Sequence, residues 1–452
     1  MPMCAAIPAA ARVSPVAARV NEWLDGCSVL RGGPGDHGAA FQLLSSVFKG
    51  NFSRAPSRDS FFASLDDPFY EPNDRILVRR GLRVLAQTQV SQRTVQFGGM
   101  TLPVSGLHAL CTLPEFRRQG FAGALVQMAQ EVMLEDGAVF GSLATNEPHF
   151  FRAHGWVVCG RQSLARAHTR HVLAQLSARG VPAASDMPHI RPLRQVELPS
   201  VMSVYAAATR GRHGPLERTE AYWRWLVSRG GYDQIFVAMG GSDRKAWDDF
   251  NSPVVGYVTV KDNRILELIT LPSIDGEFNR DQIAEQLLSR ACHEAIERDL
   301  HVVQFHAWPG ESLFNLFRVA GGEIFDREQF LGEVSMVNLF DPAGFVTRFA
   351  PELQRRVSDV KSGVELGLSI EGEKSRLVVN KRGVKLRPGP LGRDYLRLSQ
   401  AEFVRLLLGH DGAANALVSR RMHASSRQAR VIAAQLFPDL AYWRSPWDEL
   451  YL

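Results

Sequence analysis

The fold is decided by residues 107–156, which begin LHALCTLPEFRRQGFAGALVQMAQ at Leu107 and end SLATNEPHFFRAHGW at Trp156. The first run predicts an apolar strand over Leu107–Leu113, a basic loop that contains glycine, and an amphipathic helix over Phe121–Glu135. A helix that begins in this way presents unpaired backbone N–H groups at the positive end of its dipole. The sequence therefore predicts a site for a phosphate or pyrophosphate group.

Two kinds of residue make the loop suitable for such a ligand. Arg117 and Arg118 supply positive charge, and Gly120 and Ala122 keep side-chain bulk away from the approaching group. The alternative for Arg118 is a solvated surface arginine. The prediction depends on the order strand, loop, helix and second strand (Ala138–Leu143) more than on any single residue.

The pattern R-x-x-G-x-A over Arg117–Ala122 resembles the acyl-CoA pyrophosphate loop of the GNAT N-acetyltransferase superfamily, and His149–Trp156 resembles its closing motif. The resemblance implies acetyl-CoA as cosubstrate and no metal. Backbone N–H groups of Leu110, Cys111 and Thr112 are expected to hold the thioester and pantetheine arm and to stabilise the oxyanion. The pyrophosphate is expected to contact Arg117, Arg118, Gln119, Gly120, Phe121, Ala122 and Gly123.

Composition excludes several classes of protein. The net charge of +5 over 452 residues, with no dense Lys/Arg run, gives little support to nucleic-acid binding. Five scattered cysteines without a C-x-x-C pair predict reduced, buried thiols. The N-terminal run is interrupted by prolines and arginines, and no stretch of about twenty apolar residues is present. We therefore expect a cytoplasmic protein with no membrane span.

The chain is long enough for several domains. We expect a flexible tail over 1–24, an acetyltransferase domain over 25–183, a degenerate copy over 189–334 and an α+β domain over 335–452, with a linker at Ala184–Pro188. The fold class is α/β and α+β, with two tandem GNAT-like domains. The copy carries Asp275, Glu277 and Asp281 where the first domain has its basic loop, so it is not expected to bind CoA.

This layout resembles the Eis-like acetyltransferases, whose last domain is sterol-carrier-like. The resemblance implies acetyl transfer to a primary amine of a small molecule or a lysine side chain, and a homo-oligomer such as a hexamer. In that family the terminal carboxylate is thought to act as base, and Leu452 corresponds to it here. The alternative is a tail that only packs or frays.

Phe151 stands where relatives usually place a tyrosine that acts as general acid. Phenylalanine has no proton to donate, so His149 and His154 are the substitute candidates. The alternative for each is a structural or surface histidine. A thiol with a pKa near ~8.5 can also leave as thiolate without an acid. The alternative function is a catalytically silent acyl-CoA-binding or assembly protein, and a C-terminal carrier of an apolar ligand is a third.

Two further groups remain open from the sequence. The aromatic residues Phe61, Phe62, Phe69 and Tyr70 form either part of the core or the wall of an acceptor pocket. Asp448 and Glu449 either attract a cationic amine or form a solvated rim, and Trp443, Trp447 and Tyr451 are candidates to dock the C-terminal tail.

Overall fold

The computed structural model describes residues 26–48, 57–160, 162–179, 189–240, 253–272, 279–327, 329–330, 333–358 and 363–449. The chain forms two compact units. The first contains Met1–Arg93 and Val104–Leu143, and the second contains Thr94–Pro103 and Ala144–Leu452. The predicted tail, the linker at Ala184–Pro188 and Leu452 lie outside the described residues.

The first unit is built on a sheet with the strand order β1-β2-β3-β4-β5. Strands β1 to β3 pair antiparallel, whereas β5 runs parallel to β4. A parallel pair needs a crossover, and helix α4 supplies it between β4 and β5. The strands are β1 (Cys27–Arg31), β2 (Arg75–Arg80), β3 (Arg83–Phe97), β4 (Met100–Thr112) and β5 (Phe140–Thr145).

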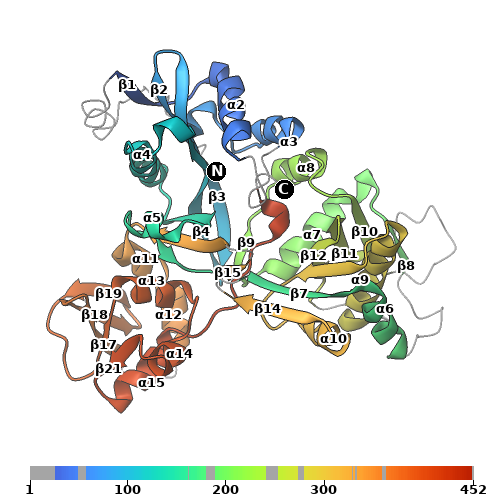
Figure 1. Cartoon of the computed structure of the whole chain (residues 1–452). Coiled ribbons are helices and arrows are strands. Elements are labelled where there is room, and N and C mark those ends of the chain that lie inside the picture. The colour runs from blue at the N-terminus through green and yellow to red at the C-terminus, as the bar shows by residue number, and fades with distance from the viewer. Residues whose placement is uncertain are drawn as a thin grey trace, which may run out of the picture. The chain divides into compact units, whose positions relative to one another are not determined.

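Helices cover both faces of this sheet, so β2 and β3 are buried over most of their length. Figure 1 shows α4 (Phe121–Glu135) on the left of these strands, and α2 (His37–Val47) with α3 (Arg58–Ala63) on the right. Helix α4 buries Phe121, Leu125, Met128 and Val132, which recur at helical spacing. It ends where Gly137 takes a left-handed conformation and Ala138 N–H donates to Met133 O.

The second unit contains a seven-stranded sheet with the order β14-β7-β13-β12-β11-β10-β8. Its strands are β7 (Gln162–His168), β8 (His189–Pro192), β10 (Gln234–Met239), β11 (Val254–Lys261), β12 (Arg264–Thr270), β13 (Val302–His306) and β14 (Glu323–Arg327). Its helices are α6 (Thr169–Ala178), α7 (Leu198–Thr209), α8 (Glu220–Ser228), α9 (Arg280–Glu297) and α10 (Phe314–Val319).

The two sheets repeat one arrangement. In the seven-stranded sheet, β10, β11 and β12 form an antiparallel meander, α9 follows, and β13 runs parallel to β12. The first unit has the same order of elements. Strands β2, β3 and β4 come first, helix α4 follows, and β5 runs parallel to β4. The repeat agrees with the predicted tandem GNAT-like fold.

The C-terminal part of the second unit carries a five-stranded sheet with the order β19-β18-β17-β20-β21. The strands are β17 (Val364–Ile370), β18 (Glu373–Asn380), β19 (Gly383–Pro388), β20 (Tyr395–Leu398) and β21 (Met422–Ala424). The helices are α11 (Pro342–Arg348), α12 (Ala350–Arg356), α13 (Gln400–Leu408), α14 (Ala413–Val418) and α15 (Arg427–Leu436). The overall class is mixed α/β with a further α+β part, as predicted.

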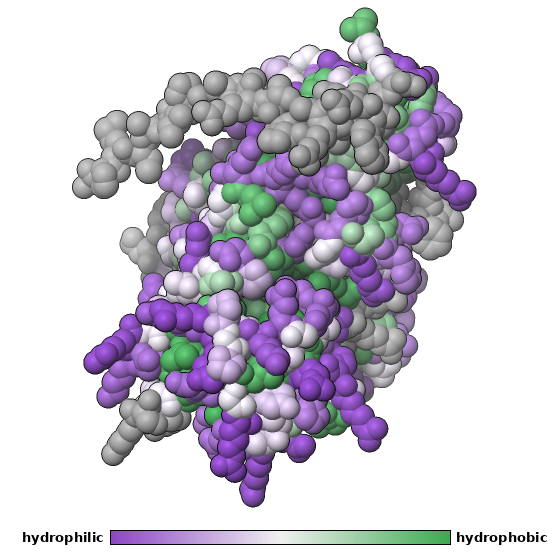
Figure 2. Space-filling view, turned by 90° about the vertical axis from the view of Figure 1, so that its left-hand side faces the viewer, coloured by the Kyte–Doolittle hydropathy of each residue, from purple (hydrophilic) through white to green (hydrophobic). Residues whose placement is uncertain are grey.

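The surface is mainly polar, as the composition suggests. Figure 2 shows hydrophilic side chains over much of one face, with hydrophobic ones gathered in scattered patches. In the five-stranded sheet, Lys374, Lys385 and Arg387 are exposed. Among the helices of the described ranges, none is both long and apolar enough to cross a membrane.

Most predicted elements are present, and α4 has the predicted bounds. The expected α+β domain over 335–452 begins within strand β16 (Glu333–Leu339), but β16 pairs with β6 (Val157–Val158) and not with the C-terminal sheet. Strand β7 and helix α6 are absent from the sequence prediction. Sequence periodicity identifies a strand but not its partner, because pairing is set by contacts far along the chain.

Candidate functional site

The predicted phosphate loop forms an open helix N-terminus in the first unit. Gly120 is the N-cap residue of α4, with φ of 88°, and no side chain caps the helix. The first helical hydrogen bond joins Ala124 N–H to Gly120 O at 3.0 Å. The N–H groups of Phe121, Ala122 and Gly123 are therefore left to an external acceptor.

The residues around this N-terminus suit an anion. Arg117, Arg118, Gln119 and Gly120 are all exposed, and a Cβ atom added to Gly120 would meet no other atom within 4 Å. Arg118 has a φ of 62°, a conformation that is uncommon for a residue with a side chain. Two exposed arginines and a row of N–H groups thus stand at the positive end of a helix dipole.

The pairing of strand β4 with β5 ends some residues before this loop. The last paired residues are Gly106 and Ser142, although β4 continues to Thr112. Ala109 has a φ of 55°, so the regular strand is interrupted there. His108, Ala109 and Leu110 are half-exposed within a strand that is otherwise mostly buried. Backbone groups near Leu110 are therefore accessible to a ligand that lies along the strand.

Cys111 and Thr112 follow this opening and are buried. Thr112 Oγ1 is buried and has no hydrogen-bond partner among the described residues. Burial raises the pKa of the Cys111 thiol to about 12. A neutral thiol is a poor nucleophile, so Cys111 is not suited to form a covalent intermediate.

The equivalent helix of the second sheet has a closed N-terminus. Asn279 caps α9 by accepting from Asp281 N–H at 3.1 Å, and Asn279 N–H donates to Gln282 Oε1 at 3.0 Å. This capping box engages the N–H groups of Asp281 and Asn279, whereas no side chain caps α4. The expected carboxylates Asp275 and Glu277 lie outside the described residues, but the closed cap independently disfavours a phosphate here.

The aromatic cluster divides between core and surface. Phe61 is fully buried beneath the guanidinium of Arg75, whereas Phe62 and Phe69 are exposed. Tyr70 is half-buried and its hydroxyl lies 3.0 Å from His37 Nε2. Phe61 is therefore a core residue, and Phe62 and Phe69 lie at the surface.

The closing motif lies in the second unit. Phe151, on α5 (Pro148–Arg152), is buried and packs against Phe150 and Trp156. His149 is exposed, and His154 is half-buried with a ring centroid 5.0 Å from that of Phe150. Burial lowers the pKa of His154. The two histidines and the loop belong to different units, so their roles as proton donors remain predictions.

The C-terminal segment is anchored in the second unit by a buried ionic cluster. Arg218 donates to both Asp448 oxygens, at 2.9 and 3.0 Å, and also pairs with Glu267. All three side chains are fully buried. Tyr257 hydroxyl donates to Glu267 at 2.7 Å, and the Arg218 guanidinium lies among the rings of Tyr205, Trp223 and Trp447.

This cluster corrects one alternative from the sequence. Asp448 was a candidate for attracting an amine or for a solvated rim, but it is buried and paired with Arg218. Burial opposes the charge of Arg218, yet the carboxylates of Asp448 and Glu267 hold its pKa well above the usual arginine range. The charges are therefore used to fix the segment and are not available to a substrate.

Further contacts fix the same segment on both sides of Asp448. Trp443 N–H donates to His213 O at 3.0 Å, and a side chain on Gly214 would collide with the Trp443 backbone. Trp447 is fully buried, and Arg229 donates to the carbonyl of Glu449 at 2.8 Å. Trp443 and Trp447 are thus packed within the second unit, whereas Tyr451 and Leu452 lie outside the described residues.

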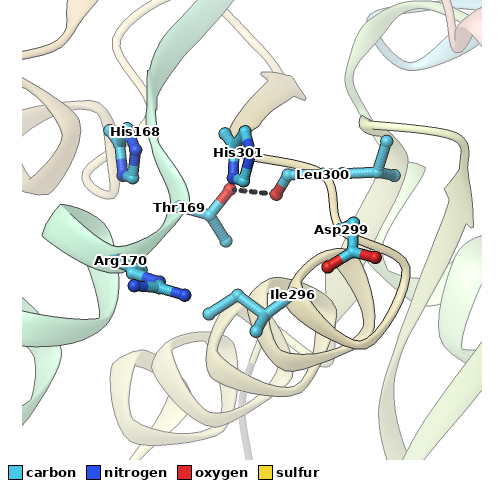
Figure 3. Close-up of a pocket in the computed structure, with 7 residues that line it drawn as sticks. All are labelled: His168, Thr169, Arg170, Ile296, Asp299, Leu300 and His301. Atoms are coloured by element: carbon cyan, nitrogen blue, oxygen red, sulfur yellow. Dashed lines mark hydrogen bonds between the residues drawn. The ribbon is translucent and has the colours of Figure 1, made fainter.

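A separate hollow lies beside the seven-stranded sheet, at the start of α6 and the end of α9 (Figure 3). Its cavity volume is about 20 Å³, and Thr169 Oγ1 within it donates to Leu300 O at 3.1 Å. Its lining is His168, Thr169, Arg170, Ile296, Asp299, Leu300 and His301. The hollow is much smaller than typical ligand pockets, so it does not suit a nucleotide cosubstrate.

Comparison with known proteins agrees with the first-unit geometry. Residues 31–159 match the family model of the acetyltransferase (GNAT) domain. The matched range contains the open loop and the closing motif. No curated protein matches the chain in sequence.

Solved structures match almost the whole chain in fold. A probable N-acyltransferase of Enterococcus faecalis has a TM-score of 0.67 at 14% identity, covering 92% of this chain and 97% of its own. A GCN5-related N-acetyltransferase of Anabaena variabilis gives 0.66 at 15% identity, covering 92% and 99%. Eis1 of Mycobacterium abscessus gives 0.61 at 14%, covering 92% and 99%. These likenesses establish the fold, and the matched domain supports acyl transfer in general.

The sequence prediction missed two groups that the structure brings together. One is Ser91 with His108, which pair across β3 and β4 at 2.8 Å. The other is Arg218 with Glu267 and Asp448. A signal for the first was present, because His108 is a polar residue in an otherwise apolar run. No local signal marks Arg218, whose partners lie far along the chain.

Proposed function

We propose that the protein is an acetyl-CoA-dependent N-acetyltransferase that acetylates a primary amine of a small molecule or a lysine side chain. The observation that carries the proposal is the uncapped N-terminus of α4, flanked by Arg117 and Arg118, directly after the opened part of β4. This arrangement offers hydrogen-bond donors and positive charge for a pyrophosphate, and accessible strand backbone for a pantetheine arm.

In the proposed reaction each part of the first unit has one task. The N–H groups of Phe121, Ala122 and Gly123, with Arg117 and Arg118, hold the pyrophosphate. Backbone N–H groups over Leu110–Thr112 hold the thioester and stabilise its oxygen as negative charge develops. The exposed rings of Phe62 and Phe69 form a wall for the amine. Since Phe151 cannot donate a proton, the thiol leaves as thiolate or receives a proton from a histidine.

The wider assignments belong to the same proposal. The second GNAT-like domain binds no CoA, because its helix α9 is capped by its own residues. The C-terminal domain is sterol-carrier-like, and the protein acts in the cytoplasm as a homo-oligomer such as a hexamer. The proposed domain limits remain 25–183, 189–334 and 335–452.

The function is tested by measuring thiol release from acetyl-CoA with polyamines, aminoglycosides and lysine peptides as acceptors. We expect turnover with at least one class of amine, at a rate well above hydrolysis without acceptor. Tight acetyl-CoA binding without turnover on any amine would instead identify the silent binding protein. That outcome is the second candidate function, and the phenylalanine at position 151 is the observation that favours it.

Removal of residues 450–452 tests the proposed role of the Leu452 carboxylate. We expect kcat to fall by about 10²-fold or more, in the range that a general base contributes. The contacts given for the C-terminal segment end at Glu449, so the truncated chain keeps the hydrogen bonds between Arg218 and Asp448. Circular dichroism and acetyl-CoA affinity should therefore stay unchanged. Full activity after the deletion would remove the carboxylate from the mechanism.

A further inference from the structure

An excess of positive charge is concentrated on the five-stranded sheet. From Lys374 to Arg393 the sequence has seven Lys or Arg residues and no Asp or Glu, which exceeds the net charge of +5 of the whole chain. This segment covers β18 almost entirely, β19 and the loop that follows, and both strands lie at the lower left of Figure 1. A protein surface usually mixes charges of both signs, whereas a field of one sign attracts a partner of the opposite sign.

Strand pairing places four of these cations on one face of the sheet. Arg376 of β18 lies directly opposite Arg387 of β19. Residues that are paired across strands point to the same face, and so do residues two apart along a strand, so Lys374 and Lys385 share this face. Leu377, which alternates with them, is buried on the other face. We call Lys374, Arg376, Lys385 and Arg387 the basic face.

Three side chains of the basic face point into solvent. Lys374, Lys385 and Arg387 are exposed, and none of them forms an ion pair with another described residue. Arg376 is half-buried and pairs with Glu365 of β17 at 3.2 Å. Like charges directly opposite each other destabilise a sheet, so the facing arginines carry a cost that an anionic partner would offset.

An apolar loop lies beside the basic face. Residues 388–392 read PGPLG, and both prolines are exposed. Gly389 N–H donates to Lys374 O at 3.1 Å, and Arg376 Nε donates to Pro390 O at 3.1 Å. These two bonds hold the loop against β18, next to the cations. Exposed apolar groups and positive charge therefore share one surface, and we call residues 388–392 the apolar loop.

Structural roles explain only part of this surface. Strand β19 is an edge strand, and Lys or Pro on an edge hinders pairing with other chains, which accounts for Lys385 and Pro388. A solvated turn accounts for Lys381 and Arg382, which join the two strands. Lys374 lies on β18, which is paired on both sides. Neither role explains why the whole segment contains no carboxylate.

The chemistry of this surface fits the headgroups of an anionic lipid bilayer. Such a bilayer attracts Lys and Arg by its surface charge, and its headgroup region accepts small apolar groups. A site for one phosphate group would need donors held around it, whereas these cations are spread over a hairpin. Residues 374–393 contain no aromatic ring on which a base could stack, so they do not suit single-stranded nucleic acid. An acidic protein would use the charge but not the exposed prolines.

We infer that the basic face and the apolar loop dock the protein on the surface of an anionic bilayer. In this arrangement the exposed Lys and Arg side chains contact lipid phosphates, and the apolar loop enters the headgroup region. The contact is peripheral. The inference concerns the five-stranded sheet alone and does not depend on the proposed acetyltransferase function.

Vesicle sedimentation with the full chain tests the docking. The probes are vesicles of phosphatidylcholine alone and vesicles that also contain about one third phosphatidylglycerol. We expect binding to the anionic vesicles only, and a weaker affinity as the salt concentration rises. The double variant Lys374→Gln with Lys385→Gln should weaken binding by about 25-fold, because each cation near the bilayer contributes roughly fivefold.

The matched control is Arg427→Gln with Arg430→Gln. These arginines are exposed on α15, outside the basic face, so the control removes the same charge from the same sheet-and-helix domain. We expect its vesicle binding to stay within about twofold of the wild-type value. Pro390→Asp puts a carboxylate into the apolar loop and should weaken binding by about fivefold or more. Unfolding in urea, followed by tryptophan fluorescence, should be the same for all variants because each position is exposed.

Several outcomes would overturn the inference. They are no binding of the wild-type chain to either kind of vesicle, equal binding to both kinds, and equal losses in the two double variants. Tighter binding to duplex DNA or to polyglutamate than to the anionic vesicles would assign the surface to a nucleic acid or to an acidic protein instead. The assay involves no acetyl transfer, so a chain that acetylates no amine leaves the docking unaffected.

Discussion

Replacing Arg117 and Arg118 together by alanine is expected to weaken acetyl-CoA binding by about 100-fold or more. A hydrogen bond to a charged group contributes about 1.5–3 kcal/mol, and the double variant removes two such donors from an exposed loop. The loss should become smaller as salt concentration rises, since the attraction is electrostatic. Isothermal titration calorimetry with acetyl-CoA measures the effect, at two ionic strengths.

The matched control is Arg280→Ala. Arg280 is the first residue of α9, the helix of the second sheet that corresponds to α4, but the N-terminus of α9 is capped by Asn279. We expect no change in affinity for this variant. If the loop variant and the control both bind acetyl-CoA as tightly as the wild-type chain, the assignment of the pyrophosphate site to α4 is wrong.

Gly120→Val tests the backbone contribution of the same site. Gly120 has a φ of 88°, which a β-branched residue adopts only with strain of about 1–3 kcal/mol. Open space surrounds the position, so the effect comes from the backbone and not from a clash. We expect the helix N-terminus to shift and acetyl-CoA affinity to fall while the two arginines remain. The variant therefore separates the contribution of the N–H donors to affinity from that of the arginine charges.

Arg218→Met is expected to destabilise the second unit by about 3–5 kcal/mol, because it leaves two buried carboxylates without their cation. Arg218, Glu267 and Asp448 are all fully buried, so water cannot replace the lost partner. Trp223 and Trp447 line the cluster, and their fluorescence reports its unfolding in urea. We expect the fluorescence transition at a lower urea concentration than in the wild-type chain. Before the transition, the emission maximum should lie at a longer wavelength, because Trp447 becomes solvated.

Arg224→Met is the control for this prediction. Arg224 pairs with Glu220 on α8, but both side chains are largely exposed, at 73% and 61%. Such a pair contributes roughly 0–1 kcal/mol, so its loss should barely move the transition. A triple variant, Arg218→Met with Glu267→Gln and Asp448→Asn, should recover part of the stability because it removes all charge. Equal transitions for Arg218→Met and Arg224→Met would contradict the anchoring role.

The two large effects concern different properties of the protein. The loop variants are expected to change ligand affinity without changing stability, because the loop is exposed and makes few internal contacts. The Arg218 variant is expected to change stability and the position of the C-terminal segment without changing the loop. Measuring both properties in both variants therefore tests the assignment of each group to binding or to structure.

The sequence by itself determined the elements whose signals lie close together in the chain. Pro114, the arginines, Gly120 and the apolar repeat from Phe121 fall within about one strand and one helix, and α4 begins and ends where they predict. The same local signals predicted the repeated order of strands and helices. A helix start, a turn and an amphipathic period are set by neighbouring residues, so they can be identified without knowing the fold.

Only the tertiary structure decided how distant residues are paired. Ser91 meets His108 because β3 and β4 lie side by side and Gly106 leaves space between them. Asp448 looks like a solvated acid in the sequence, but a partner 230 residues away removes it from solvent. Strand β16 likewise pairs with β6 and not with the strands that follow it. These features depend on strand register and on the compensation of buried charge, which a local pattern does not contain.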